Sequence, residues 1–264
     1  MNSPKIAMLA PMWGLMFLWL ALVAVSGVLA YRTWRRTVGA MRTQLLYLSV
    51  GSAIVFVGDL LHTIAFTVST YTGVPTGPVH ILGSVFEFRT FAMFFDALAF
   101  MVYYTLWALF IVARYQQGSL ALYDKVTLVL AVTSMALILP GVIPNALGVY
   151  SLDYNIAIWA PHMILFIVFG VMTVWKLISC SQYAFKQASG VVMHTQERAL
   201  TIAGIGFAFS FLFFTLFLLL TALKSEPGIF MILKTFAYML AFFYLIKGFI
   251  LPAQTFQVTA NRCG

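Results

Sequence analysis

The chain has 264 residues, of which 62% are hydrophobic and only 8% are charged, and its formal net charge is +8. A soluble globular domain carries about 25% charged residues, so this composition excludes one. Because lipid offers no hydrogen-bond partners to the backbone, long apolar runs predict membrane-spanning helices. The strands of a transmembrane barrel would alternate apolar and polar residues, and this sequence does not. The positive charge indicates membrane topology and not nucleic-acid binding.

Seven segments are long and apolar enough to cross the hydrocarbon core, which takes about 20 residues. The expected spans are residues 8–31, 43–71, 86–114, 124–145, 156–182, 198–223 and 227–251. The first is interpreted as a transmembrane helix and not as a cleaved signal, since no small-residue cleavage site follows it. No polar segment is long enough for a soluble domain. The whole chain, residues 1–264, is therefore predicted to be one all-α transmembrane domain.

Basic residues gather on one side of the predicted bundle. The connections on this side and the C-terminal end hold Arg32, Arg35, Arg36, Arg42, Arg114, Lys125, Lys176, Lys186, Arg198, Lys247 and Arg262. The opposite side has only Lys5 and Lys224 outside the spans. Cytoplasmic loops carry the excess of Lys and Arg. We therefore predict a multi-pass protein of the cell membrane, with its N-terminus outside and its C-terminus inside.

Short sequence matches predict an internal repeat. Residues 88–92 (FRTFA) resemble residues 233–237 (LKTFA), and the Ala-Pro pair at 10–11 recurs at 160–161. The two offsets, 145 and 150 residues, nearly agree. This pattern predicts that residues 8–114 and 156–251 are parallel repeats, joined by the helix at 124–145. Parallel repeats of this kind occur in transporters.

Two further features predict structure. The connection at residues 72–80 is rich in turn formers, and Pro75 and Pro78 exclude a continuous helix there. Within the sixth span, Gly206 and Ser210 form a pair of small residues four apart, which predicts a seam of close helix packing.

Six ionisable residues in the spans are the candidate ligand-binding residues: Asp59, His62, Arg89, Asp96, His162 and Lys234. At 1.5 Å per residue, all six lie in the outer half or near the middle of the roughly 30 Å core. Asp59 and His62 are three residues apart and share a helix face. Charged groups at this depth face the protein interior. We therefore predict one polar cavity that opens outward, with almost nothing ionisable in the inner half before the cytoplasmic rim.

Each candidate also has a structural interpretation. Arg89 and Lys234 can extend to the outer interface by snorkelling. Asp59 can be a structural partner of His62 or of a helix backbone, and Asp96 can form a structural ion pair with another helix. His162 follows a proline in the first turns of its span and can be a packing histidine.

The favoured functional hypothesis is binding or transport of a small solute or ion with proton coupling. Carboxylates near the middle of a membrane can take up and release protons. Arg89 and Lys234, at the mouth of the predicted cavity, favour an anionic solute. Against transport, the inner half offers few polar residues for an exit path.

Two alternatives stay open. His62 and His162 are the only histidines in the spans and lie at similar depth, so they are candidate axial ligands of haem b in an electron-transfer subunit. The other alternative is a receptor-like or accessory subunit, which needs partner subunits because no effector domain is predicted. An enzyme is not expected: zinc ligation within the spans lacks the HExxH spacing of a metalloprotease.

Overall fold

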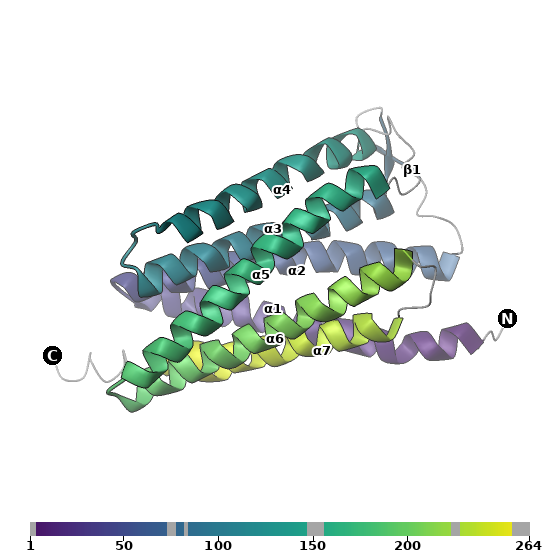
Figure 1. Cartoon of the computed structure of the whole chain (residues 1–264). Coiled ribbons are helices and arrows are strands. Elements are labelled where there is room, and N and C mark those ends of the chain that lie inside the picture. The colour runs from purple at the N-terminus through teal and green to yellow at the C-terminus, as the bar shows by residue number, and fades with distance from the viewer. Residues whose placement is uncertain (1–3, 73–77, 82–83, 147–155, 223–227, 255–264) are drawn as a thin grey trace.

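The computed structural model describes residues 4–72, 78–81, 84–146, 156–222 and 228–254 and contains seven long helices (Figure 1). They are α1 (Pro4–Arg36), α2 (Ala40–Thr72), α3 (Phe88–Tyr115), α4 (Leu122–Ala146), α5 (Ile156–Gln187), α6 (Val191–Ala222) and α7 (Gly228–Leu245). α7 runs directly into a π-helical turn, η1 (Ile246–Ile250). All seven helices contain a segment long and apolar enough to cross a membrane. The predicted seven-helix membrane fold is therefore confirmed.

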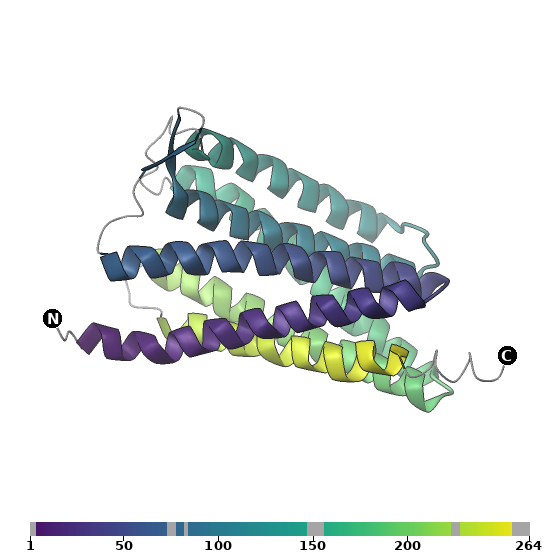
Figure 2. The same ribbon diagram turned by 180° about the vertical axis from the view of Figure 1, so that it is seen from behind.

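The helices form a closed ring in chain order. Each helix packs against the next along the chain, and α1 packs against α7, which closes the ring. Figures 1 and 2 show α1 beside α2 and α7, with the helices extending lengthwise along the bundle. α3 also packs against α5 and has 56% of its membrane-spanning segment buried, the largest share of the seven. α3 therefore lies nearest the centre of the bundle.

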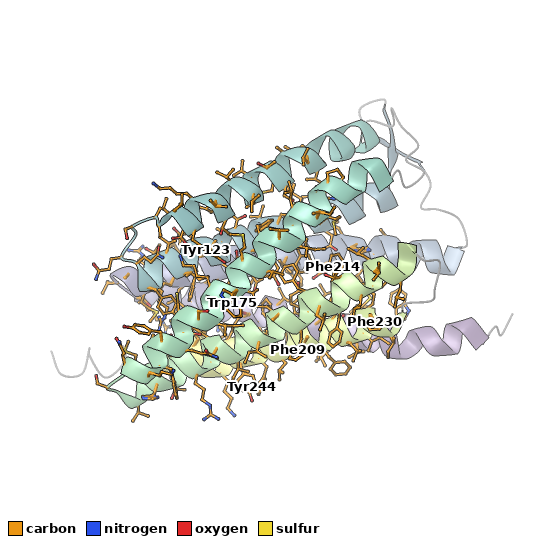
Figure 3. All side chains as sticks on the ribbon, in the orientation of Figure 1. Tyr123, Trp175, Phe209, Phe214, Phe230 and Tyr244 are labelled. Carbon is orange, nitrogen blue, oxygen red and sulfur yellow. The ribbon has the colours of Figure 1, made fainter. Side chains whose placement is uncertain are left out.

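Side chains fill the space between the helices along the bundle (Figure 3). Apolar residues such as Trp175 and Phe209 are exposed on its outside, as expected of a surface that contacts lipid. The predicted packing seam is confirmed at Gly206, where an added Cβ would lie 2.9 Å from the carbonyl oxygen of Ala237 and 3.0 Å from the Cβ of Ala241. α6 and α7 can approach this closely only because Gly206 has no side chain.

The connection between α2 and α3 is not helical throughout, as predicted. It includes β1 (Pro78–Ile81) and β2 (Ser84–Glu87), which pair antiparallel with His80 opposite Val85. β2 also packs against α4 and α3. The connection therefore folds back onto one end of the bundle.

The start of α6 differs most from its predicted boundary. The helix begins at Val191, seven residues before the predicted span at 198–223. Residues 191–197 are largely polar, which predicts a loop, yet Gln196 and Glu197 are buried inside the bundle. Both side chains form hydrogen bonds to other helices, so their buried polar groups are satisfied. The same groups would lack partners on a helix face that contacts lipid.

We name the two ends of the bundle by the predicted topology. The outer end is the one where α1 begins and the hairpin lies, and the inner end is the one where α1 ends. The orientation itself and the internal repeat remain predictions. Reporter fusions after Arg36, Gln117 and Gln187 should read cytoplasmic, and fusions near Thr76 and Asp153 should read external.

Candidate functional site

Four of the six candidate residues come together in the outer half of the bundle. Asp59 and His62 lie on α2, Asp96 on α3 and Lys234 on α7, and we refer to these four as the outer cluster. Nδ1 of His62 lies 2.9 Å from Oδ2 of Asp96. Asp59 interacts electrostatically with Asp96, Lys234 and His62. Arg89 lies in the first turn of α3, and its side chain falls outside the described part of the structure.

Asp59 is tied to the first helix by an indole. Nε1 of Trp19 donates a hydrogen bond to Oδ2 of Asp59, with 2.6 Å between the two atoms. Trp19 is almost completely buried, and its ring packs against those of Tyr238 and Phe242 with centroid distances of 5.3 and 5.0 Å. The sequence does not reveal this role of Trp19, because a tryptophan in an apolar helix is normally interpreted as a packing residue.

The pair formed by His62 and Asp96 leaves one oxygen without a partner. Oδ1 of Asp96 is buried and accepts no hydrogen bond from the residues that the structure describes. The side chains of His62 and Asp96 are 33% and 14% exposed, so the pair as a whole is not sealed off. A buried carboxylate oxygen without a donor is costly. It can be satisfied by a proton, a water molecule or a ligand.

The close approach of α2 and α3 depends on Gly58. A Cβ at this position would lie 2.8 Å from the Cβ of Ala99 and 3.2 Å from the Cα of Asp96. Real Cβ atoms essentially never come as near as the first distance. The missing side chain of Gly58 therefore allows His62, one turn further along α2, to reach Asp96.

Lys234 points into the bundle and is surrounded by aromatic rings. Its Nζ lies 5.2, 5.8 and 6.0 Å from the ring centroids of Phe214, Phe100 and Tyr238. A cation is attracted to the negative face of such rings. Within the described ranges Lys234 forms no ion pair with a carboxylate at 4 Å or less. These contacts with α3, α6 and α7 argue against the interpretation that Lys234 snorkels to the outer interface.

His162 lies on α5, which contributes none of the four residues of the outer cluster. It is fully buried in α5, and its backbone carbonyl accepts a hydrogen bond from Oγ of Ser134 at 2.9 Å. The same hydroxyl lies 3.5 Å from the sulfur of Met101 on α3. Met101 and Asp96 are five residues apart, which is about 140° around the helix. Ser134, which is bonded to the backbone of His162, and His62 therefore contact different faces of α3, which gives no support to one haem held between the two histidines.

Below the outer cluster, the bundle is filled by five fully buried aromatic residues, the aromatic layer: Tyr103, Tyr104, Trp107, Phe207 and Phe242. The Tyr103 ring stacks on that of Phe242 with a centroid distance of 5.9 Å. Phe207 meets the rings of Tyr104 and Trp107 edge-on, at 5.9 and 5.4 Å. The hydroxyl of Tyr104 donates to that of Tyr238 at 3.0 Å, which joins this layer to a ring beside Lys234. The layer separates the outer cluster from the inner end.

The inner end holds a second polar network, the inner cluster: Gln44, Arg114, Tyr115, Gln196 and Glu197. Nη2 and Nε of Arg114 donate to Oε1 of Glu197 at 2.5 and 3.0 Å, and Nη1 donates to Oε1 of Gln44 at 2.9 Å. The hydroxyl of Tyr115 donates to the other carboxylate oxygen of Glu197 at 2.6 Å. The side chains of Arg114 and Glu197 are only 9% and 1% exposed. This network ties α2, α3 and α6 together.

The π-helical turn η1 packs against the inner cluster. Nε2 of Gln196 donates to the carbonyl oxygen of Phe249 at 3.4 Å, and the guanidinium carbon of Arg114 lies 5.0 Å from the Phe249 ring centroid. Single π-helical turns within α-helices are frequent at functional sites. The last part of the seventh helix therefore contributes both a ring and a backbone acceptor to this network.

The ionisable groups near the inner rim are buried and paired, whereas the sequence indicates solvated charges there. Glu197 is buried and bonded to Arg114, and Asp124 is buried and paired with Lys176. All four lie near span ends, where the sequence indicates solvated loop charges. Their pairing joins positions far apart in the chain, which no local pattern reveals.

No family model, no curated protein and no solved structure matches this chain. The length and apolar composition of its seven helices are those of an integral, multi-pass membrane protein. Among the described residues, no group of three or more His, Cys, Asp or Glu side chains is arranged to hold a metal ion. The function is therefore argued from the outer cluster.

Proposed function

We propose that the protein binds a small anionic solute at the outer cluster and carries it across the membrane together with a proton. The observation that carries this proposal is the meeting of two carboxylates, an imidazole and an ammonium from three helices inside a membrane-spanning bundle. Ionisable groups in such a position are costly, and they mark ion and proton pathways. A structural ion pair needs only one acid and one base.

The charge balance of the outer cluster links the anion to a proton. With both carboxylates ionised, Lys234 charged and His62 neutral, the four groups carry one net negative charge. An anion bound beside Lys234 adds a second net negative charge. Asp59 already interacts with the ammonium group of Lys234. Excess charge is expensive where the dielectric constant is low. A proton taken up by Asp59 or His62 returns the net charge to that of the empty site, so anion and proton bind best together.

Each residue then has a distinct role. Lys234 attracts the anion, and Arg89 in the first turn of α3 supplies a second positive charge nearer the outer end. Asp59, held in place by Trp19, carries the proton. His62 exchanges protons between Asp96 and the outside, and the unsatisfied oxygen of Asp96 accepts a hydrogen bond from water or from a protonated ligand.

The route inward is closed by the aromatic layer and by the inner cluster. Transport requires the stacked rings of Tyr103 and Phe242 to part, and the bonds between Arg114 and Glu197 to open. The inner cluster also supplies polar groups for an exit path, of which the sequence of the inner half offers few. Secondary transporters open their two ends alternately around a fixed binding site near the middle of the membrane.

The test is uptake by the purified protein in liposomes, with chloride, phosphate, acetate and succinate as probes under an inward proton gradient. We expect uptake of at least one of these anions by the wild type, and its loss in Lys234→Gln. The matched control is Lys247→Gln, which removes an exposed lysine of η1, the turn that continues α7. Equal uptake by Lys234→Gln and Lys247→Gln would refute the anion site.

The haem b electron-transfer subunit and the accessory subunit remain alternatives. The absorption spectrum of the purified protein tests the first, since a Soret band with a reduced α-band would identify haem b. A colourless preparation removes this alternative.

A further inference from the structure

One face of α1 points away from the bundle. Phe17, Leu18, Val25 and Val28 are between 48% and 59% exposed, whereas Val23 and other residues of the opposite face are completely buried. Positions 18, 21, 25 and 28 are separated by three, four and three residues, which places them on one helix face. This exposed face is apolar throughout, and in a membrane it lies against lipid.

The exposed face ends in three arginines at the inner end. Arg32, Arg35 and Arg36 are all exposed, and together they line a concavity of about 410 Å³. Arg32 follows Val28 by four residues, and Arg35 and Arg36 follow Arg32 by three and four, so the three arginines continue the apolar helix face. No salt bridge that the described side chains form involves any of the three. Three guanidinium groups therefore share one concavity without an acid to balance them.

The dimensions of this face match one lipid leaflet. Leu18 and Val28 are ten residues apart, about 15 Å along the helix axis. This is half of the roughly 30 Å hydrocarbon core. Tyr31 follows, with its ring 5.4 Å from that of Trp34, at the level where aromatic residues meet lipid headgroups. The order along α1 is therefore an apolar stripe, an aromatic pair and a cationic concavity.

We propose that this face of α1 binds an anionic phospholipid of the inner leaflet. The phosphate lies among Arg32, Arg35 and Arg36, and an acyl chain follows the stripe from Val28 to Leu18. Guanidinium groups bind phosphate oxygens through paired, charge-assisted hydrogen bonds. Clusters of basic residues at the cytoplasmic end of a transmembrane helix attract anionic lipids. The site is separate from the outer cluster and independent of the transport function.

The test is native mass spectrometry of the full chain in detergent, titrated with dioleoyl phosphatidylglycerol or dioleoyl phosphatidylcholine. We expect the anionic lipid to bind about a hundredfold more tightly, at about fivefold for each arginine, and Arg32→Gln/Arg35→Gln/Arg36→Gln to abolish this preference. The control, Lys125→Gln/Lys186→Gln/Arg198→Gln, removes three exposed cations elsewhere at the inner end. This control variant should still prefer the anionic lipid. If the triple arginine variant does not fold, the single variants should each weaken binding about fivefold.

Three results would overturn the proposal. Equal losses in the arginine variant and its control would show that only the overall positive charge matters. Displacement of the lipid by inorganic phosphate alone, or equal binding of dihexanoyl and dioleoyl phosphatidylglycerol, would show a phosphate site without a place for the acyl chain. A dimer that dissociates when Val25 and Val28 are changed to Ser would show that a second copy of the chain covers this face.

Discussion

The outer and inner clusters contain similar chemical groups but satisfy them very differently. In the inner cluster, Glu197 accepts hydrogen bonds at both oxygens, from Arg114 and from Tyr115. In the outer cluster, Asp96 keeps a buried oxygen without a donor in the described part of the chain. A fully satisfied buried network makes a structure rigid and specific, whereas an incompletely satisfied one points to chemistry. This contrast is in line with the proposal that the outer cluster binds the solute, whereas the inner cluster holds the bundle closed.

The largest effect on stability is expected from breaking the inner cluster. Arg114→Ala leaves Glu197 as a buried carboxylate without its cation, and removal of one partner of a buried pair costs about 3–5 kcal/mol. Thermal unfolding in detergent should show a large fall in the midpoint temperature. The exposed neighbour Arg198→Ala should show almost none.

A double-mutant cycle sharpens this prediction. Because Arg114→Ala/Glu197→Ala removes both charges, it should destabilise the protein less than the sum of the two single variants. If the effects of the single variants add, the two side chains do not act as a pair, and the contrast between the clusters fails.

A smaller loss of stability, together with a loss of function, is expected from Trp19→Phe. The change keeps an aromatic ring beside Phe242 but removes the donor to Asp59. A hydrogen bond to a charged group contributes about 1.5–3 kcal/mol, so proton-coupled uptake should slow by about tenfold or more. The exposed Trp175→Phe is the matched control. Equal rates in both variants would show that the indole only packs.

The smallest effect on folding is expected from His62→Ala, because His62 is one-third exposed and its partner Asp96 is already incompletely bonded. The midpoint of thermal unfolding should change by only a few degrees, while binding of the transported anion weakens. Isothermal titration with the anion identified by the uptake experiment measures this directly. A large loss of stability with unchanged affinity would make the pair structural, like the inner cluster.

The sequence predicts the seven helices well because long apolar runs encode membrane spans directly. It also places Asp59, His62, Asp96 and Lys234 at similar depth, since helical rise converts position into height. It does not reveal which helices face each other, and so it misses the bond from Trp19 to Asp59, 40 positions apart. The sequence misses Glu197 for another reason. Glu197 lies beside Arg198 at the edge of an apolar run, a position typical of a charged loop residue. Its partner Arg114 is 83 positions away, so no local pattern indicates the pair.

The central claim is that a proton enters with the anion through Asp59. The direct measurement is the internal pH of liposomes that contain the purified protein and a trapped pH-sensitive dye, after the transported anion is added outside. The wild type should acidify the interior as the anion enters. Asp59→Asn should fold normally by size-exclusion chromatography and produce no acidification, because the amide keeps the shape of the side chain but cannot titrate. Full anion-driven acidification by Asp59→Asn would contradict the account.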